Sequence, residues 1–345
     1  MKSKVYILYT GGTFGMKNTG GNGLQPSTWE EIIDYLPAIK NQTFFHYFSE
    51  INFTFETLEP VIDSSDITPQ IWEGIAHKVQ ENYKSHDGFI ILHGTDTLAY
   101  TASALSFIFQ NLTKPVVLTG AQLPIFHPRT DGIVNLSNAI YIAGYKSFDL
   151  ACIPEVCICF NDDVLRGNRA VKTSTNDFEG FSSPNFENLA NLEQQILVNK
   201  HLLCHSSTQE EFSLKTKFSD SVVNVTVFPG YNPRHLIELV KSKKIEGIVL
   251  KTFGAGNLPT SKSWHELISE CESTNTLILA TTQCPNGKIE LGQYESSMVL
   301  KNTIVIDGKD ITSEAALTKL MWVIGNFNIP ERRSILSQNL RGEIT

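Results

Sequence analysis

Short apolar runs, each followed by polar residues or glycines, recur along the first half of the chain. The first run covers Lys4 to Tyr9 and is broken by the segment Thr10, Gly11, Gly12, Thr13, Phe14 and Gly15. A strand that ends in glycines lets the main chain approach a ligand closely and leaves the flanking hydroxyl groups at the carboxyl edge of a sheet. A tight turn without chemistry would contain the same glycines, so this pattern alone leaves both interpretations open.

Further apolar runs alternate with helix-like segments. We expect strands at residues 51–55, 89–92, 115–118 and 155–160, with a break at Pro60, and helices that start near residues 27, 69 and 98 or lie near residue 140. Ser27 and Glu30 have the spacing of a capping box, and the polar, glycine-rich residues 17–25 predict a loop that covers the first turn as a lid. Short strands alternating with helices predict a mostly parallel sheet covered by helices on both faces.

A smaller set of elements follows a polar stretch. We place a linker at residues 196–215, between a larger N-terminal α/β domain at residues 1–195 and a smaller C-terminal α/β domain at residues 216–345. In the second domain we expect strands at 222–228, 247–251 and 276–280, helices that begin after Asn232 and at Ser263, and closing helices at 315–324 and 331–340. The expected fold class is α/β with two domains of unequal size.

Polar side chains follow four of the predicted strands in the first domain. They are Thr10 and Thr13; Asp63, Ser64 and Ser65; Thr95 and Asp96; and Thr119. Because the carboxyl ends of parallel strands meet at one edge of a sheet, we expect these groups to converge on one site. A threonine hydroxyl there can act as a nucleophile and form a covalent ester if a neighbouring base takes its proton.

The pattern offers no well-placed histidine as that base. A lone histidine such as His93 is more often a structural group with satisfied hydrogen bonds. Lysine is the other candidate, because a lysine beside a carboxylate and a hydroxyl can relay a proton. Lys172 fits this role, since it lies in the polar segment 166–173, which has neither helical nor strand periodicity; spacing alone does not favour it over Lys78 or Lys84.

Charge and motif spacing narrow the function classes. A net charge of −8 without a large basic block argues against a nucleic-acid partner. The glycines after the first strand do not form the dinucleotide-binding pattern, and no phosphate-loop lysine follows them, so we expect no cofactor. His201, Cys204 and His205 have ligand-like spacing but no fourth partner, and we predict no metal site.

The start of the chain and its cysteines indicate a cytoplasmic protein. The first apolar run reaches only Tyr9, which is too short for a signal-peptide core or a membrane span. Six cysteines in 345 residues, with Cys157 and Cys159 alternating in a strand-like stretch, are expected to be buried free thiols. We therefore expect neither membrane association nor a disulfide framework.

Together, the motifs resemble those of the bacterial L-asparaginases. The two signature motifs are Thr10-Gly11-Gly12-Thr13 and His93-Gly94-Thr95-Asp96-Thr97. The resemblance continues through residues 63–66, 119–121, 166–172, 254–257 and 337–343, and so covers nearly the whole chain. Without a signal peptide, the chain is similar to the type I, cytoplasmic branch of this family.

This resemblance implies a reaction and roles for individual residues. Thr13 would attack the side-chain amide of asparagine, release ammonia and form a β-aspartyl ester that water hydrolyses, without a cofactor. Thr95, Asp96 and Lys172 would form a second catalytic cluster, and main-chain N–H groups near Thr95 would stabilise the oxyanion. The substrate-binding residues would be Asp63, Ser64, Ser65, Gly94, Ala121 and Asn257. Family members are generally tetramers built as two intimate dimers, so Asn257 would reach the site of a partner subunit.

Three interpretations remain open at this stage. The first is a cytoplasmic asparaginase. The second is an amidase of the same fold that also takes glutamine or serves a transamidation enzyme. The third is an inactive asparagine sensor, against which Lys172 argues because binding alone would not need that lysine.

The sequence departs from the family pattern at two places. Many relatives have a tyrosine in the loop after the first motif, where this chain has Leu24 and its neighbours. Val171 and Lys251 stand where we expect other residues in members that asparagine activates at a second site. We therefore assume neither that this loop takes part in catalysis nor that asparagine activates the protein at a second site.

Overall fold

The computed structural model describes residues 2–18, 20, 23–35, 48–204, 210–292, 297, 300 and 303–345. The chain divides into two units, Met1–Leu214 and Lys215–Thr345. Each unit has its own sheet, so the two are described one after the other.

The first unit is built on an eight-stranded sheet. Its order is β13 (Ile196–Val198), β12 (Ala190–Leu192), β9 (Asp163–Arg166), β8 (Val156–Phe160), β7 (Val116–Thr119), β5 (Gly88–Leu92), β1 (Ser3–Gly11) and β4 (Ile51–Ile62). The five strands from β8 to β4 are parallel, and β9, β12 and β13 extend the sheet in antiparallel fashion. The prediction of a mostly parallel sheet is confirmed.

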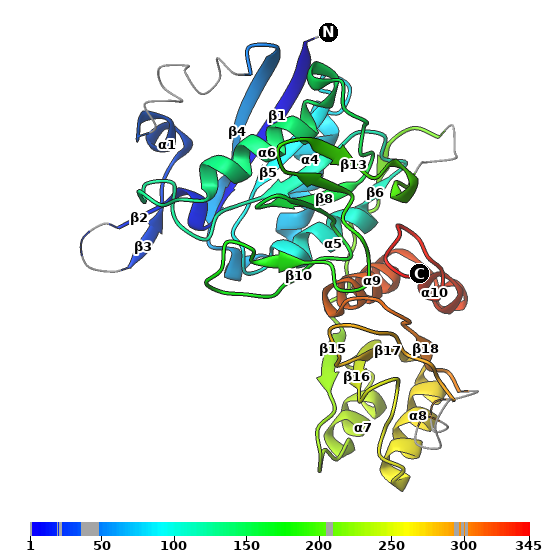
Figure 1. Cartoon of the computed structure of the whole chain (residues 1–345). Coiled ribbons are helices and arrows are strands. Elements are labelled where there is room, and N and C mark those ends of the chain that lie inside the picture. Colours follow the sequence, from blue (N-terminus) through cyan, green and yellow to red (C-terminus); the bar gives the residue numbers. More distant parts are fainter. Residues whose placement is uncertain are drawn as a thin grey trace. The chain divides into compact units, whose positions relative to one another are not determined.

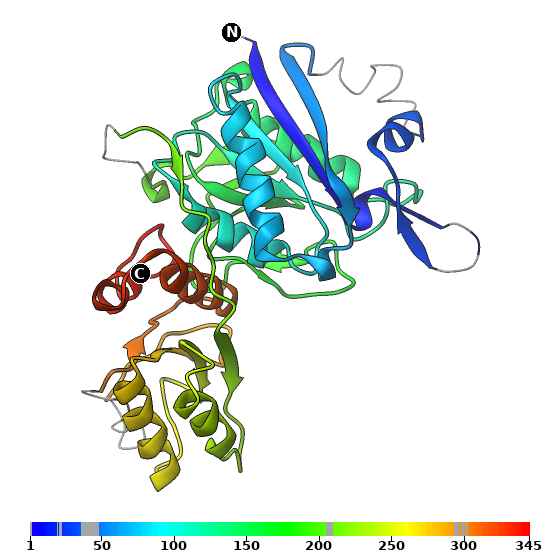
Figure 2. The ribbon, with the colours of Figure 1, turned by 180° about the vertical axis from the view of Figure 1, so that it is seen from behind.

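Helices cover both faces of this sheet. Figure 1 shows α6 (Gly132–Ala143) on one face, and Figure 2, from behind, shows α4 (Pro69–Asn82) and α5 (Leu98–Ile108) on the other. Along β1, the alternate residues Ile7 and Tyr9 belong to the same core cluster as Leu136 of α6. Because side chains alternate across a strand, the residues between them face the opposite layer, and both faces of β1 are buried.

Short elements complete the first unit. Three pairs are antiparallel: β2 (Met16–Asn18) with β3 (Leu24–Pro26), β10 (Val171–Lys172) with β11 (Phe181–Ser182), and β6 (Phe109–Gln110) with β14 (Ser213–Leu214). Single turns of 3-10 helix are η1 (Thr13–Gly15), η2 (Ser64–Asp66), η3 (Tyr145–Phe148) and η4 (Lys200–Leu202). Part of the loop expected at residues 17–25 is thus a β-ribbon.

The first helix begins one residue later than Ser27 and Glu30 predict. In α1 (Trp29–Tyr35), the Glu31 N–H donates to Thr28 Oγ1 at 3.3 Å and the Thr28 N–H donates to Glu31 Oε2 at 3.2 Å. This is a capping box displaced by one position. The displacement has a tertiary cause, because the Ser27 N–H donates instead to the Gly15 carbonyl at 2.8 Å. The sequence predicts the end of this helix near Leu36, which lies outside the described residues.

Two further expectations are corrected. β4 continues through Pro60, which the sequence predicts as a break; as an edge strand, β4 tolerates a residue without an N–H. The described part of the predicted linker up to Leu214, residues 196–204 and 210–214, contributes β13, η4 and β14 to the first unit. The polar residues do not mark a linker, because these short elements lie at the surface of the first unit, where polar side chains face solvent.

The second unit is a four-stranded parallel sheet. Its order is β15 (Val222–Thr226), β16 (Gly247–Thr252), β17 (Leu277–Thr282) and β18 (Ile306–Asp307). The helices are α7 (Arg234–Lys241), α8 (Lys262–Thr274), α9 (Ser313–Asn326) and α10 (Ile329–Leu336). Val240, Ile248 and Trp264 lie in one buried cluster between strands and helices. The smaller α/β domain is confirmed, and β18 is a strand that the sequence did not predict.

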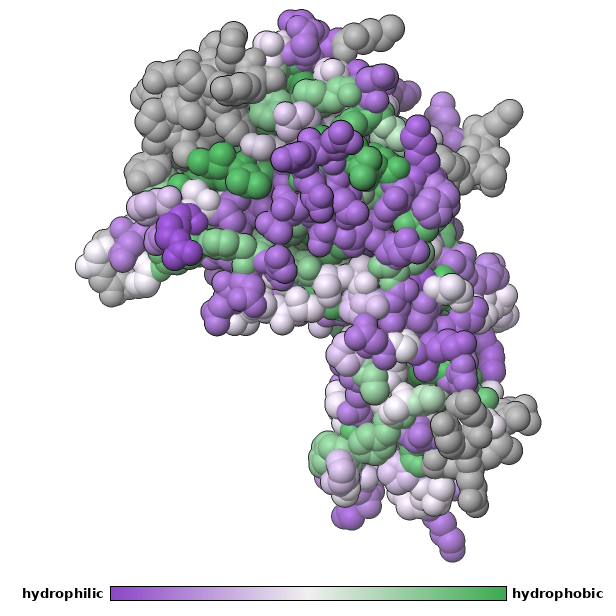
Figure 3. Space-filling model, viewed as in Figure 1, coloured by the Kyte–Doolittle hydropathy of each residue, from purple (hydrophilic) through white to green (hydrophobic). Residues whose placement is uncertain are grey.

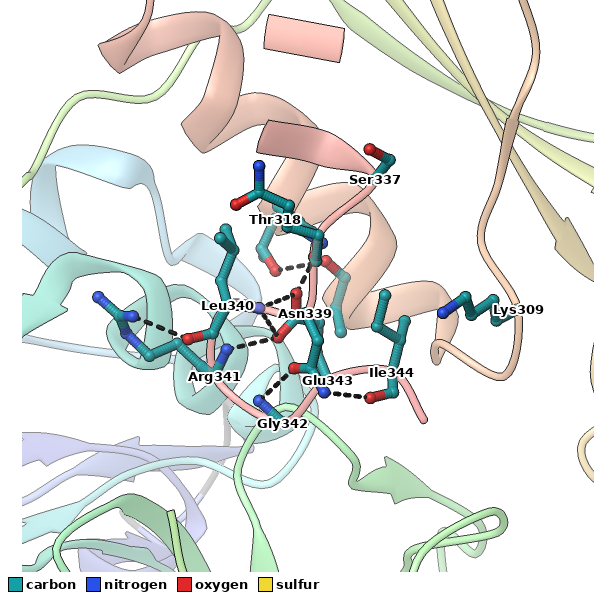
Figure 4. A network of polar contacts seen from close by, with 12 residues as sticks. Lys309, Thr318, Ser337, Asn339, Leu340, Arg341, Gly342, Glu343 and Ile344 are labelled. Atoms are coloured by element: carbon teal, nitrogen blue, oxygen red, sulfur yellow. Dashed lines mark hydrogen bonds and ion pairs between the residues drawn. The ribbon is translucent and has the colours of Figure 1, made fainter. Parts of the chain in front are cut away.

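A buried ion pair anchors the end of the second unit. Lys319 Nζ of α9 lies 2.6 Å from Glu343 Oε1, and their side chains are 1% and 0% exposed. Figure 4 shows how the main chain turns around the Glu343 carboxylate, which accepts hydrogen bonds from the N–H groups of Leu340 and Arg341. These donors and the ammonium compensate the cost of burying the carboxylate.

The described surface is mixed in character. Figure 3 shows hydrophilic side chains over most of the first unit on one face, with smaller apolar patches between them. The larger apolar side chains that are exposed include Val134, Leu197, Phe228 and Ile329. Within the described residues, no helix combines the length and the apolar character that a membrane crossing requires.

Candidate active site

The glycines after β1 create the first turn of the site. Gly11 and Gly12 have φ values of 116° and 80°, in the region that glycine occupies without strain. The Gly12 N–H donates to the Ile62 carbonyl at 3.1 Å, so this turn is fixed to the end of β4. Thr13 follows as the first residue of η1. At this position an N–H group has no acceptor within the helix.

The turns that carry the two signature motifs are in direct main-chain contact. A Cβ atom on Gly12 would lie 2.2 Å from Gly94 Cα, and a Cβ atom on Gly94 would lie 2.6 Å from Ser64 Cβ. No side chain larger than hydrogen fits at either glycine without displacement of its neighbour. Thr13, Ser64 and Thr95 therefore come from three loops that pack against one another at the carboxyl edge of β1, β4 and β5.

Lys172 reaches the second of these turns. Its Nζ donates to Thr95 Oγ1 at 2.8 Å and to Asp96 Oδ1 at 2.6 Å. The Lys172 side chain is 17% exposed and that of Asp96 is 68% exposed, so the ammonium is shielded while the carboxylate remains largely in solvent. A lysine, a hydroxyl and a carboxylate thus lie within hydrogen-bond distance, although 77 residues separate Thr95 from Lys172.

The polar segment before Lys172 is a buried turn between β9 and β10, in agreement with the edge or loop that its lack of periodicity predicts. Arg166 donates to Glu155 through Nε at 2.6 Å, and also to the Leu202 carbonyl at 2.6 Å. Arg169 is buried as well and its guanidinium lies over the ring of Phe186. The charges are satisfied inside the protein by a carboxylate, carbonyl groups and an aromatic face, which a hydropathy pattern does not register.

Gln122 is a site residue that the sequence analysis missed. Its Oε1 accepts a hydrogen bond from Thr95 Oγ1 at 3.4 Å, and its Nε2 donates to the carbonyls of Ser174 and Asp177. It thereby connects Thr95 to the segment that follows Lys172. The sequence feature that could have identified Gln122 is its position two residues after Gly120, just past the carboxyl end of β7. Polar residues at such strand ends often line a site.

The loop after β4 presents Asp63, Ser64 and Ser65. Asp63 Oδ1 accepts two hydrogen bonds at 2.9 Å, from the N–H and the hydroxyl of Ser65. Ser64 is buried, and its carbonyl accepts from Thr97 Oγ1 at 2.7 Å. The bond from Thr97 therefore connects the motif at residues 93–97 to this loop. Both bonds from Ser65 go to Asp63 Oδ1, and neither goes to Asp63 Oδ2.

Other hydroxyls at the strand ends have structural partners. Thr10 Oγ1 donates to the Leu92 carbonyl at 2.9 Å, and Thr119 Oγ1 donates to the Cys159 carbonyl at 2.7 Å. Both side chains are buried and connect neighbouring strands, so the expectation that they join the site is corrected. Ala121 is fully buried beside Gln122.

His93 has the structural environment that the sequence favours. It is fully buried, its Nδ1 lies 2.7 Å from the Gly94 carbonyl, and its Nε2 lies 3.0 Å from Thr101 Oγ1. Burial lowers its pKa from 6.5 to about 4, so the imidazole is neutral at physiological pH.

Metal and thiol chemistry find no support in the described part of the chain. No group of three histidine, cysteine or acidic side chains with a metal-binding arrangement occurs there, and His205 of the ligand-like triplet lies outside it. All six cysteines are free, as expected, but only Cys157, Cys159 and Cys271 are buried, so the expectation that all are buried is corrected. Asn257 lies in the second unit, where its N–H and carbonyl both bond to Phe253.

The chain matches known families over both units. The family model described as "Asparaginase, N-terminal" matches residues 4–203, and that described as "Glutaminase/Asparaginase C-terminal domain" matches residues 221–334. The chain belongs to the asparaginase family. The resemblance predicted from the two signature motifs is thereby confirmed for the whole chain rather than for one domain.

Individual members of the asparaginase family are similar over the full length. The chain is 35% identical to "L-asparaginase 1" of Escherichia coli (strain K12), an alignment that covers 100% of this chain and 98% of that protein. The solved structure of L-asparaginase I from Vibrio cholerae covers 100% of both chains at 35% identity, with a TM-score of 0.86. The chain is also 32% identical to the "60 kDa lysophospholipase" of Mus musculus, but spans only 62% of that longer protein.

Proposed function

We propose that this protein is an L-asparaginase, which hydrolyses L-asparagine to L-aspartate and ammonia. The observation that carries the proposal is the hydrogen-bonded cluster of Lys172, Thr95 and Asp96 beside the turn of Thr13. Full-length similarity to proteins named L-asparaginase supports the substrate. The name of the mouse relative concerns another reaction, but the similarity spans only 62% of that longer protein.

Thr13 is the proposed nucleophile. Its Oγ1 attacks the side-chain carbonyl carbon of asparagine, the carbonyl oxygen becomes an oxyanion, and loss of ammonia leaves a β-aspartyl ester on Thr13. Two features support this role. Thr13 is only partly buried, and it directly follows Gly11 and Gly12, whose positive φ values turn the chain sharply after β1.

Thr95, Lys172 and Asp96 are proposed to move the protons. Because the Lys172 ammonium donates to Thr95 Oγ1, negative charge on that oxygen is stabilised, and the hydroxyl gives up its proton more readily. Thr95 passes its own proton to the leaving amide nitrogen, which departs as ammonia, and takes a proton from Thr13 in exchange. In the second step Thr95 takes a proton from the hydrolytic water and returns one to the Thr13 oxygen as the ester is cleaved. Asp96 keeps the ammonium aligned by accepting its second hydrogen bond at 2.6 Å.

Backbone groups and the loop after β4 are proposed to bind the substrate. N–H groups near Thr95 stabilise the oxyanion, and Asp63, Ser64 and Asp96 hold the α-amino and α-carboxyl groups. Ser65, Gly94 and Ala121 complete the binding surface in this proposal. We also propose that the enzyme is a cytoplasmic homotetramer in which Asn257 completes the site of a partner subunit.

Ammonia release by the purified protein tests the proposed function. L-Asparagine and L-glutamine would be supplied separately to the wild type and to Thr13→Ala. Ammonia from asparagine, lost in Thr13→Ala while aspartate still binds, supports both the reaction and the nucleophile. Equal release from glutamine would support a glutaminase-asparaginase, whereas binding of asparagine without product would support the sensor interpretation.

A further inference from the structure

A buried chain of hydrogen bonds ends on the main chain of the second signature turn. Trp72 Nε1 of α4 donates to Thr101 Oγ1 of α5 at 3.0 Å, and Thr101 Oγ1 lies 3.0 Å from His93 Nε2. His93 Nδ1 lies 2.7 Å from the Gly94 carbonyl oxygen. His93 and Thr101 are fully buried, so water does not compete for these bonds. Two helices are thus connected through one imidazole to the turn that precedes Thr95.

The two end groups of this series of hydrogen bonds determine which atom is the donor in each bond. The indole Nε1 of Trp72 can only donate and the Gly94 carbonyl can only accept. His93 Nδ1 must therefore carry a proton. Since the imidazole is neutral, Nε2 is an acceptor, and the Thr101 hydroxyl, which already accepts from Trp72, donates its proton to Nε2. This series of hydrogen bonds therefore fixes the Nδ1–H tautomer of His93.

The bond from His93 also orients the N–H of the next residue. The Gly94 carbonyl and the Thr95 N–H belong to one peptide group, which is trans and planar, so they point in opposite directions. A hydrogen bond that holds the carbonyl oxygen therefore holds the N–H direction as well. Within the described residues, the Thr95 N–H has no hydrogen-bond acceptor, although Thr95 itself is buried.

The opposite side of this peptide is held by packing. Gly12 lies against Gly94 so closely that an added Cβ would come within 2.3 Å of the Gly94 nitrogen. The peptide of Gly94 and Thr95 is thus restrained by main-chain contact on one side and by the imidazole on the other. An unpaired N–H held in this way is the kind of preorganised donor that stabilises a developing oxyanion.

We propose that His93 is a positioning residue for catalysis, which holds the Gly94–Thr95 peptide so that the Thr95 N–H meets the oxyanion of the tetrahedral intermediate. The inference rests on the proposed amide hydrolysis, because only that reaction creates the oxyanion. His93 itself touches neither the substrate nor the proposed nucleophile. Its effect is on the transition state, so its loss lowers kcat more than it raises KM.

The test uses a pair of substitutions that separate the two ring nitrogens. His93→Asn keeps an N–H donor near the position of Nδ1, whereas His93→Leu has a similar volume and no donor. Loss of one oxyanion donor typically costs a factor of 10² to 10³ in kcat, and a misoriented donor should cost less, so we expect roughly a tenfold fall in His93→Leu. KM should stay within about twofold, and His93→Asn should recover a large part of kcat.

A second buried histidine provides a matched control. His86 is in the same unit and its Nε2 contacts Thr54 Oγ1 at 2.9 Å, but its Nδ1 contacts Asn82 and Ser85 rather than a site loop. His86→Leu should cost similar stability in urea unfolding and leave kcat within about twofold. Equal kcat for His93→Leu and the wild type would overturn the proposal, and so would equal losses in His93→Leu and His93→Asn.

A spectroscopic measurement does not depend on activity. The ¹⁵N shifts of the His93 ring in the full-length protein should report the Nδ1–H tautomer, and Thr101→Val should change them because it removes the donor to Nε2. An Nε2–H tautomer in the wild type would overturn the positioning argument. If the wild type released no ammonia from asparagine, the proposed function would have failed instead, and the tautomer would remain a separate result.

Discussion

Gly12 and Gly94 touch through their main chains, with no room for a Cβ atom on the first of them, since that atom would lie 2.2 Å from Gly94 Cα. This contact is the geometric link between the two signature motifs. It joins the turn after β1 to the turn after β5, two parallel strands that lie side by side in the sheet. Thr13, the proposed nucleophile, and Thr95, the proposed proton relay, each follow directly after one of these glycines.

Substitution of either glycine should therefore damage the site. We expect Gly94→Ala to lower kcat at least tenfold, because its Cβ would come within 2.6 Å of Ser64 Cβ and displace the loop that holds Asp63. Ammonia release and urea unfolding measure the two effects. Gly74→Ala in α4 is the control, since its Cβ would meet only Leu58 Cδ1 at 3.9 Å; similar activity in both variants would contradict the argument.

Lys172→Met should remove turnover without unfolding the protein. The ammonium is the donor to Thr95 Oγ1, so we expect kcat to fall by roughly 10³, within the range that acid–base groups contribute. The free energy of unfolding should change by less than about 1 kcal/mol, because the partner Asp96 is largely exposed.

A surface lysine provides the comparison for Lys172. Lys78 Nζ pairs with Glu56 Oε1 at 2.6 Å on another part of the first unit, and Lys78→Met removes a charge of the same sign. We expect full ammonia release from this variant. Near-normal kcat in Lys172→Met would remove that residue from the mechanism, whereas loss of activity in both variants would point to a general effect of charge.

The ion pair between Lys319 and Glu343 should be a large contribution to the stability of the second unit. Glu343→Gln leaves a buried ammonium without its counter-charge, and we expect a loss of about 3–5 kcal/mol in the free energy of unfolding. Urea unfolding followed by tryptophan fluorescence measures it. Glu266→Gln removes an exposed partner of Lys241 and should change stability by less than about 1 kcal/mol; equal effects would show that burial does not matter here.

The neutral His93 should make folding stability depend on pH. Its pKa is 6.5 when unfolded and about 4 in the folded protein, so between these values the unfolded state binds more protons. Stability from this group is complete above pH 6.5 and falls as the pH drops toward 4, by a total on the order of 3 kcal/mol.

Urea unfolding at several pH values tests this dependence. Between pH 4 and 6.5 the wild type should lose more stability than His93→Asn, in which this titration is absent. The described hydrogen-bond partners of the His93 ring are the Gly94 carbonyl and Thr101, neither of which titrates in this pH range. The same slope in both proteins would mean that His93 titrates normally in the fold.

Some of the site could be predicted from the sequence because it is encoded locally. The run Lys4–Tyr9 is apolar over the length of a strand, and the glycines after it permit positive φ, so the first strand and turn are visible without a fold. Thr68 before Pro69 likewise locates the start of α4. These features depend only on residues close in the chain.

Other features depend on neighbours that are distant in the chain. The capping box at Thr28 and Glu31 replaces the one at Ser27 because Ser27 bonds to Gly15. Thr10 and Thr119 follow strands in the same way as Thr95, yet their hydroxyls are used by neighbouring strands. The sequence pattern shows that a hydroxyl is present but not which acceptor it meets.

The sequence by itself determined the α/β class, the strand ends at which polar groups gather and, through its two motifs, the family. Only the tertiary structure decided which groups meet: that Lys172 rather than Lys78 lies 2.8 Å from Thr95 Oγ1, that Gln122 is the second partner of Thr95, and that His93 serves the turn as a neutral donor. The physical reason is the separation along the chain of the residues that interact. Periodicity and turn chemistry act over a few residues, whereas hydrogen bonds and burial act between strands that the fold brings together.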